Sequence, residues 1–414
     1  MSGNIAALAS YNGTGTQGTA VVDSPEREGE IVSTIWNKND TTRQLITGTA
    51  VKELTPGGIV SETLNNTVTT FTIGSDVDVI GEMYLHVYAT SNEDFAGIGN
   101  FSNVSGNGSV SKIEILIGSQ VWQTLTGFSI FANQQVSNQT TAIESLFGGG
   151  FAYNSGNGAG PPYTYNYILP LDGAFVNTSS PTRSNFSDQV NNGYLMAAAS
   201  NQDMHIKVYW GSGLDIWMNS SNVPQLVSFK ACKMFCRQTT LSNFEREKIR
   251  SMVLPKRVIM NQTTYQPVTL ESGTRNYNFS INCDSFNIFA GALAIDLSIQ
   301  MLSMNNVSGL SINTVELFLN GSSFSGPLTL EFLMNCGSFL NISKAFNTVL
   351  LFPLSDNLYG SGVPLNRFDS IRLVIKLVGA NFDLASDMPD KLNVTAIGQS
   401  TILYSGGAAS LNKY

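Results

Sequence analysis

Strand-length runs of apolar or alternating residues recur along almost the whole chain and constrain its fold more than any other feature. Clusters of Gly, Asn, Ser and Thr separate these runs, many of which are rich in Val, Ile, Phe and Tyr. Many short strands divided by turn residues are typical of sandwiches or barrels, so we predict an all-β protein. The clearest runs are Thr67–Ile73, Ile80–Tyr88, Ile113–Ile117, Tyr163–Leu171, Ile206–Trp210, Leu226–Phe235, Tyr277–Ile281, Phe286–Ile299, Val315–Leu319, Val349–Leu354, Ile371–Leu377 and Leu392–Leu403.

One segment, Leu241–Val253, has a helical pattern instead. Ser242 is placed to cap a helix, Glu245 follows three residues later as in a capping box, and Pro255 is expected to end the helix. Strand patterns lie on both sides, and a chain of 414 residues is long enough for two or three domains. The predicted organisation is an N-terminal arm at 1–25, a first domain at 26–240, a connector at 241–255, a second domain at 256–404 and a C-terminal tail at 405–414.

The two halves of the chain repeat three elements in the same order. Each pair shares its apolar pattern and one or two distinctive residues, such as a Glu within the strand or a Pro near its end. A single match of this kind arises by chance in a β-rich chain, but an ordered set predicts two copies of one fold. The pairs are Ile113–Ser119 with Val315–Ser322, Tyr167–Asp172 with Leu351–Asp356, and Asp203–Val208 with Asp369–Val374.

Charge and hydropathy exclude several classes of protein. Charged residues make up 13% of the chain and the formal net charge is −8, with no dense Lys/Arg cluster of the kind that neutralises phosphates. The longest apolar run, Ile288–Ile295, is far shorter than the roughly 20 residues that span a bilayer. Residues 1–10 lack the basic and apolar regions of a signal peptide. We expect no direct binding of nucleic acid and no membrane insertion.

The residues that could support catalysis are few. His86 and His205 are the two histidines, both lie in strand-like runs, and the sequence contains no G-x-S-x-G elbow for a Ser-His-Asp hydrolase. Glu114 and Glu316 could suggest the acid pair of a glycosidase, but they occupy matching places in the two repeated halves. We therefore predict that the protein is not an enzyme, and we assign no catalytic residue and no cofactor.

Four cysteines are too few and too scattered for a disulfide framework. Cys232 and Cys236 have a C-x3-C spacing, but no second Cys/His pair follows them as a zinc site would require. Cys283 and Cys336 stand alone in the second half. Buried free thiols are the expected state of all four, and no metal ligand is assigned.

Asn-X-Ser/Thr sequons are abundant in this Asn-rich and Thr-rich chain. Most are expected to be coincidental, and ordinary secretory glycosylation is not expected without a signal peptide. The candidate glycosylation sites are Asn100, Asn138, Asn185, Asn261, Asn278, Asn341 and Asn393.

Four segments resemble the double jelly-roll major capsid proteins of large eukaryotic DNA viruses, the algal-virus and iridovirus group. Lys112–Gln123 (KIEILIGSQVWQ) is similar to a family strand that carries a Glu and ends in a Gly turn. Leu226–Arg250 resembles the end of the family's first domain with its Glu-Arg connector. Pro364–Leu373 is similar to a signature of the second domain, and Leu392–Tyr414 to the family's C-terminus. The resemblance touches both halves of the chain.

The resemblance implies a structural role in a virion. In that family two jelly rolls stand side by side, and three chains form a pseudo-hexameric capsomer that tiles an icosahedral shell. The implied partners are two further copies of the chain, neighbouring capsomers and minor capsid or cement proteins, and the implied site of assembly is the host cytoplasm. Long loops of the first domain, such as Asn92–Ser109, are expected to face outward.

A second hypothesis is a secreted or surface carbohydrate-binding β-sandwich protein, such as an adhesin. Low charge, the sequons and a set of aromatic residues fit it. The missing signal peptide and the unpaired cysteines argue against it. The aromatic candidates for stacking on a sugar are Trp122, Trp210, Trp217, Tyr163 and Tyr165.

Overall fold

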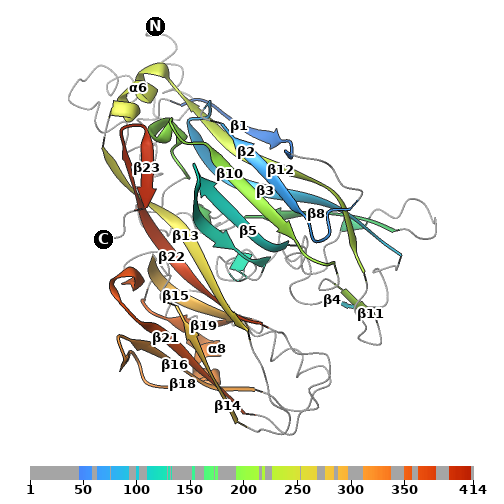
Figure 1. Ribbon diagram of the computed structural model, residues 1–414, viewed down its shortest axis with the longest axis vertical. Helices are drawn as coiled ribbons and strands as arrows, with labels where there is room; N and C mark the ends of the chain where they lie inside the picture. Colours follow the sequence, from blue (N-terminus) through green and yellow to red (C-terminus); the bar gives the residue numbers. More distant parts are fainter. Residues whose placement is uncertain are drawn as a thin grey trace, which may run out of the picture.

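A computed structural model gives the positions of the strands described below. The described residues are 46–57, 63–74, 76–92, 99–101, 110–127, 129–130, 132, 152–153, 163–171, 173–175, 193–213, 217–219, 226–251, 253–267, 276–283, 288–296, 311–336, 349–356, 362–378 and 391–411. Two β-sandwiches follow one another along the long axis of the molecule (Figure 1). None of the described helices has the length and apolar character needed to cross a membrane.

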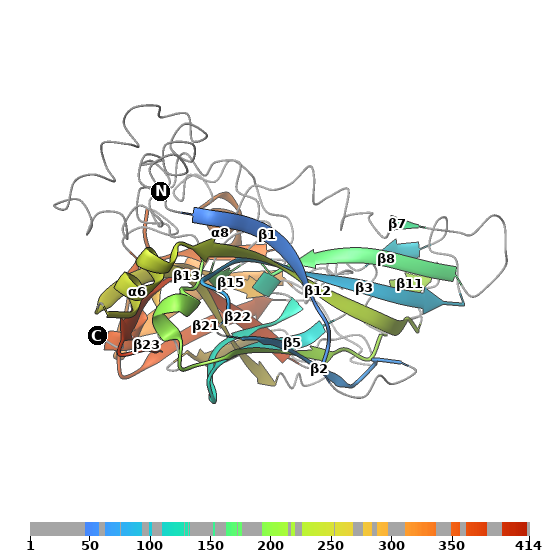
Figure 2. The ribbon, with the colours of Figure 1, turned by 90° about the horizontal axis from the view of Figure 1, so that it is seen from above.

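The first sandwich consists of two antiparallel sheets, which Figure 2 shows as separate layers. One sheet contains, in spatial order, β1 (Ile46–Leu54), β12 (Ser228–Leu241), β3 (Val79–Ser91), β8 (Tyr163–Pro170) and β7 (Ala152–Tyr153). The other contains β2 (Val68–Ile73), β10 (Met204–Trp210), β5 (Val110–Ile117) and β6 (Gln120–Leu125). Strand β10 alternates buried and half-buried residues along its whole length, so one face of it lines the core. A separate pair joins β4 (Gly99–Phe101) to β11 (Trp217–Asn219).

The second sandwich repeats this plan. One sheet contains β19 (Val349–Pro353), β15 (Phe289–Asp296), β22 (Lys391–Ser405), β13 (Leu254–Pro267) and β9 (Ala174–Phe175), with β20 (Val363–Pro364) and β23 (Ala408–Leu411) at its margins. The other contains β14 (Asn276–Asn282), β21 (Ile371–Val378), β16 (Ser311–Leu319), β17 (Ser322–Ser323) and β18 (Leu328–Thr329). The short helix α8 (Leu330–Asn335) follows β18, and its N-cap is Thr329.

Both sandwiches are jelly rolls with the same connectivity. When the eight principal strands of each are numbered along the chain, the order is 1-8-3-6 in one sheet and 2-7-4-5 in the other. The predicted all-β fold with two jelly rolls is confirmed. All three repeated sequence pairs fall on equivalent strands, namely β5 with β16, β8 with β19 and β10 with β21.

Equivalent hydrogen bonds show which residues of the two rolls correspond to one another. The amide of Leu171 donates to the carbonyl of Met83 at 2.9 Å, and the amide of Leu354 donates to the carbonyl of Gly291 at the same distance. In the hairpin after the fourth strand, Gly118 donates to Asp203 and Asn320 donates to Ser370, both at 2.8 Å. Asp203 is therefore equivalent to Ser370, not to Asp369 as the sequence match proposed. The one-residue shift puts the buried Ile206 opposite the buried Leu373 and restores the common inward face.

Among the strands of six or more residues, the sequence did not reveal β1, β6 and β13. Their sequences contain many polar residues. Strands β1 and β6 lie at sheet edges, and one face of β13 contacts the other roll. The helical connector is confirmed as α6 (Asn243–Ser251), but Pro255 does not end it. The helix ends at Ser251, and Pro255 is the second residue of β13, opposite Leu403.

The C-terminus also differs from the expected tail. Ala408–Leu411 forms β23, which pairs with the end of β22 around the turn at Gly406 and Gly407. Residues 405–411 thus continue the sheet of the second roll, and the amide of Ala409 also donates to Gln202 of the first roll. The predicted N-terminal arm at 1–25 lies outside the described residues.

Candidate functional site: the seam between the two rolls

The first roll contributes a two-residue strand to the second roll. Phe175 and Ala174 of β9 pair with Ile259 and Met260 of β13, so a segment of one roll extends the sheet of the other. The amide of Asn261 continues this ladder by donating to the carbonyl of Gly173 at 3.3 Å. This backbone pairing fixes the position of the second roll on the first.

The side chain of Gln123 links β6 to both of these paired segments within the seam. Its side-chain amide, carried by β6, donates to the carbonyl of Gly173 and to the carbonyl of Asn261, the latter at 3.0 Å. Both side chains, of Gln123 and Asn261, are buried. Gly173 has a φ of +84°, and a Cβ atom there would lie 2.6 Å from Asn261 Cγ, so only glycine fits.

A cluster of aromatic side chains fills the adjoining part of the seam. The Tyr194 ring lies 5.2 to 5.9 Å, centroid to centroid, from the rings of Phe175, Tyr404 and Trp122. The hydroxyl of Tyr404, on β22, accepts a hydrogen bond from the amide of Leu195 at 3.1 Å. Burial raises the pKa of both tyrosines above the ordinary value, so both hydroxyls stay protonated.

The segment before β10 holds the C-terminal hairpin of the second roll. It contains the buried 3-10 turn η5 (Met196–Ala199). The amide of Asn201 donates to the carbonyl of Gly407 at 2.9 Å, and the Gln202 side chain accepts from the amide of Ala409 at 2.7 Å. These bonds join parts of the chain about two hundred residues apart and close the seam at its upper end (Figure 1).

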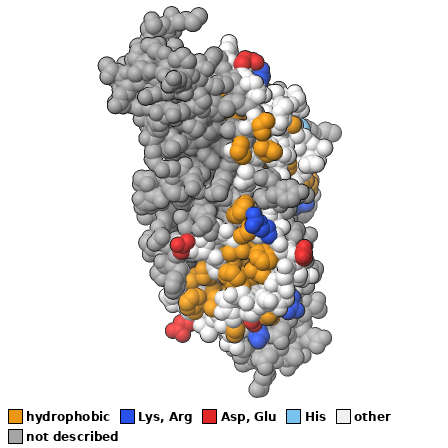
Figure 3. Space-filling view, turned by 90° about the vertical axis from the view of Figure 1, so that its left-hand side faces the viewer, with side chains coloured by type: hydrophobic (Ala, Val, Ile, Leu, Met, Phe, Trp, Pro, Cys, Tyr) orange, Lys and Arg blue, Asp and Glu red, His pale blue; other side chains and the backbone are white. Residues whose placement is uncertain are grey.

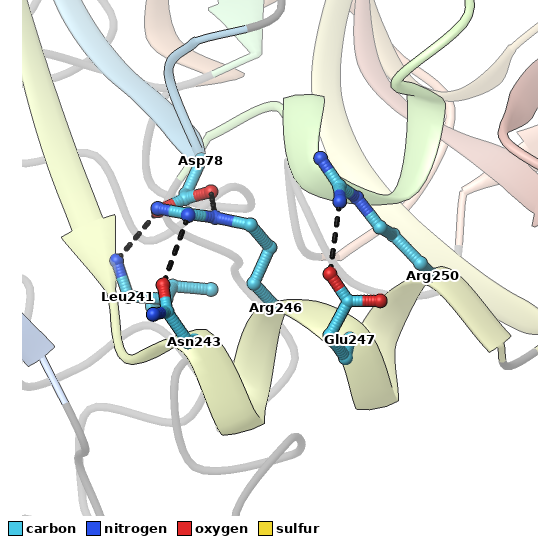
Figure 4. A network of polar contacts seen from close by, with 6 residues as sticks. All are labelled: Asp78, Leu241, Asn243, Arg246, Glu247 and Arg250. Carbon is cyan, nitrogen blue, oxygen red and sulfur yellow. Dashed lines mark hydrogen bonds and ion pairs between the residues drawn. The ribbon is translucent and has the colours of Figure 1, made fainter.

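An ion pair fixes the connector helix to the first roll (Figure 4). The carboxylate of Asp78, next to β3, accepts hydrogen bonds from Arg246 of α6 at 2.6 and 2.8 Å. It also accepts the amide of Leu241, the last residue of β12, at 2.7 Å. The Asp78 side chain is 2% exposed, and the three bonds compensate for the desolvation of its charge. The start of the second roll is therefore held in a defined direction.

The sequence-predicted candidates lie apart from this seam. The His86 ring lies 4.7 Å from the ring of Tyr88 on β3, and His205 Nδ1 is 3.1 Å from Thr72 Oγ1 on the outer face of the other sheet. Glu114 and Glu316 are on equivalent strands of different rolls, as the repeat predicted. Within the described part of the chain, no three His, Cys, Asp or Glu side chains gather where a metal ion could be held.

Glu114 takes part in a surface network instead. Lys112 Nζ lies 2.6 Å from its carboxylate and 4.3 Å from the centre of the Tyr209 ring, and the Tyr209 hydroxyl donates to Glu114 at 2.8 Å. Partial desolvation raises the pKa of Glu114, but the hydrogen bonds from Lys112 and Tyr209 and the charge of Lys112 outweigh it and lower the pKa. This carboxylate is stabilised as an anion and is not poised as a general acid.

The four cysteines are buried and are not joined by disulfide bonds, as expected. Burial raises the pKa of the thiols of Cys232 and Cys336 to about 11 and that of Cys236 to about 12, with the nearby Glu82 adding to the last. The thiolate form is therefore strongly disfavoured at neutral pH. Such thiols pack as small apolar groups.

One glycosylation candidate needs correction. Asn261 is fully buried in the seam, so a glycan cannot be attached to it in the folded chain. Asn100, Asn278 and Asn393 lie on the backbones of β4, β14 and β22. The remaining candidates, Asn138, Asn185 and Asn341, lie outside the described residues.

Sequence reasoning missed the residues that build the seam. Gly173, Tyr194 and Asp78 belong to no motif, and these three residues and Gln123 each act through a partner more than 40 positions away in the chain. The one signal in the sequence was the resemblance of Lys112–Gln123 to a family strand, because Gln123 is the last residue of this segment.

No family model matches this sequence, and no curated protein matches it. Solved structures do match. VP54 of PBCV-1, fitted into a reconstruction of the virophage Sputnik, is 13% identical with a TM-score of 0.65, covering 89% of this chain and 97% of that chain. A quasi-atomic model of the PBCV-1 virus capsid is 12% identical with a TM-score of 0.63 and the same coverage.

The Faustovirus major capsid protein is 9% identical with a TM-score of 0.58, covering 86% of this chain and 90% of that chain. Each alignment extends over both rolls and nearly the full length of the known structure. Likeness at such low identity establishes the fold. The chain therefore has the double jelly-roll fold of the major capsid proteins that its sequence motifs resemble.

Proposed function

We propose that this protein is a structural capsid protein of a large icosahedral DNA virus. The observation that supports the proposal is the structural match of both rolls, over 86 to 89% of the chain, to capsid proteins of PBCV-1 and Faustovirus. A capsid subunit needs a rigid shape and extended contact surfaces, not activated side chains. The buried bonds of the seam supply that rigidity by fixing two sandwiches as one block.

Three chains form one capsomer in this proposal. Six rolls then surround a common axis, and the resulting pseudo-hexamers tile the shell together with neighbouring capsomers and minor capsid or cement proteins. The protein acts without catalysis and without a cofactor. It is located in the virion, and assembly takes place in the host cytoplasm.

The domain limits of the proposal follow the sequence prediction. The first jelly roll corresponds to residues 26–240, the connector to 241–255 and the second roll to 256–404. Pairing of β23 with β22 argues for extending the second roll through Leu411.

The alternative of a carbohydrate-binding adhesin loses part of its support. Trp122 and Trp210 are both buried, and the Trp210 indole donates to Thr69 Oγ1 at 2.8 Å inside the core. Neither ring can stack on a sugar at the surface.

The solution mass of the purified full chain tests the capsid proposal. We expect a stable species near three times 44.6 kDa by light scattering, and six-sided particles by electron microscopy. A strict monomer at all concentrations that binds to a glycan array would contradict the capsid role and favour the adhesin.

A further inference from the structure

The contact between the rolls joins two particular strands. Strand β6 is the fifth strand of the first roll, and β13 is the first strand of the second. Gln123 of β6 donates to the carbonyl of Asn261 on β13 at 3.0 Å, and both side chains are buried. The second roll has its own fifth strand, β17, and the first roll has its own first strand, β1; within the described part of the chain, neither strand pairs with the other roll.

Phe324 occupies the position of Gln123 in the second roll. Gln123 lies opposite Ile115 of β5. The amide of Phe324 donates to the carbonyl of Leu317 of β16 at 2.8 Å, and Leu317 is equivalent to Ile115 in the register that the hairpin bonds define. The fifth-strand side of the second roll thus presents a phenylalanine where the first roll presents its buried glutamine.

Glu53 occupies the position of Asn261 in the first roll. A row of paired residues crosses one sheet of each roll and ends on the equivalent prolines of the sixth strand. The row in the first roll is Glu53, Phe235, Tyr84 and Pro170. The row in the second roll is Asn261, Ile397, Ala292 and Pro353.

The two equivalent surfaces are exposed. Phe324 is 42% exposed, and Val51 of β1, two residues from Glu53, is 61% exposed. Strand β1 is the last strand of its sheet in the described part of the chain, whereas β9 pairs with the equivalent edge of β13. The two surfaces lie toward opposite ends of the molecule (Figure 1). On the side where β16 and β18 lie, hydrophobic side chains gather over the second roll (Figure 3).

We propose that the fifth-strand side of the second roll, around Phe324, docks onto β1 of a second copy of this chain. The contact between copies then repeats the contact between the rolls within one copy. Each chain uses two different surfaces, so the interface is heterologous, and the proposed trimer requires that the rotation between successive chains closes a ring of three. The inference rests on the proposed self-assembly and assigns residues to its interface.

Charge insertion tests this interface. We expect Val51→Asp and Phe324→Asp each to convert the trimer of the full chain to a monomer, a threefold fall in mass by light scattering. Val253→Asp is the matched control, because Val253 is 65% exposed and lies on neither surface. Its trimer should be unchanged. Trimers that persist in both interface variants, or a control that dissociates equally, would overturn the proposal.

Cross-linking tests the pairing directly and does not depend on dissociation. A Val51→Cys chain is mixed with a Phe324→Cys chain under mild oxidation, while the four native thiols are protected by burial. We expect a disulfide between unlike chains and little between like chains. Exclusive like-with-like products would refute the head-to-tail contact. A monomeric unmodified chain would reject the capsid proposal itself, whereas a trimer that both interface variants leave intact would reject only this interface.

Discussion

Removal of the Asp78 carboxylate is expected to weaken the junction between the first roll and the connector. In Asp78→Ala the Arg246 guanidinium loses hydrogen bonds of 2.6 and 2.8 Å, and the Leu241 amide loses its acceptor at 2.7 Å. Breaking a buried pair by removing one partner typically costs about 3–5 kcal/mol. Arg246 is 25% exposed and can turn partly toward water, so we expect a loss near the lower end, about 3 kcal/mol.

Thermal and urea unfolding of the full chain measure this loss. For a cooperative unit of roughly 200 residues, about 3 kcal/mol lowers Tm by about 6–12 °C. Asp78→Asn keeps one acceptor for the Leu241 amide and should lose less. In a double-mutant cycle, Asp78→Ala and Arg246→Ala should be far from additive, because either change alone removes the same ion pair. A loss below about 1 kcal/mol in Asp78→Ala, or an additive double variant, would refute this account of the junction.

Three further predictions concern the seam and the core. Gly173→Ala should lower the free energy of unfolding in urea by about 2 kcal/mol or more, because its φ is +84° and the new Cβ would press on Asn261; an unchanged midpoint would argue against the seam geometry. Gln123→Leu should cost about 1–3 kcal/mol by removing the hydrogen bonds that the side chain donates to the buried carbonyls of Gly173 and Asn261, and Gln123→Glu should not restore the stability. Stability should fall above about pH 9, because an unfolded thiol releases its proton there while Cys236, whose pKa is raised to about 12, keeps its proton in the folded chain. Cys236→Ala should flatten that part of the pH profile, and an identical profile would contradict it.

The repeat in the sequence was the most informative local signal. Alternating apolar residues mark strands because their inward faces must be dry, and equivalent strands of two similar sandwiches keep similar patterns. The match between Ile113–Ser119 and Val315–Ser322 therefore located the fourth strand of each roll correctly. Pattern alone did not fix the register of the third pair. The hydrogen bonds from Gly118 and Asn320 show the one-residue difference.

The residues of the seam could not be predicted from the sequence for a related reason. Polar residues such as Gln123 and Asn261 ordinarily indicate a solvent-facing strand, and Asn261 even reads as a glycosylation site. Burial reverses this interpretation once another roll covers them. The Gln123 side-chain amide then donates to the backbone carbonyls of Gly173 and Asn261, which the contact has removed from water.

The sequence by itself determined an all-β chain, the helical connector and the duplication, because each depends on the period and spacing of neighbouring residues. Tertiary structure alone decided the order of the strands, the residues that hold the two rolls together and the surfaces left exposed at Val51 and Phe324. Those properties depend on which distant segments of the chain come into contact. The free energy of such a contact depends on both segments together and cannot be assigned to one of them alone.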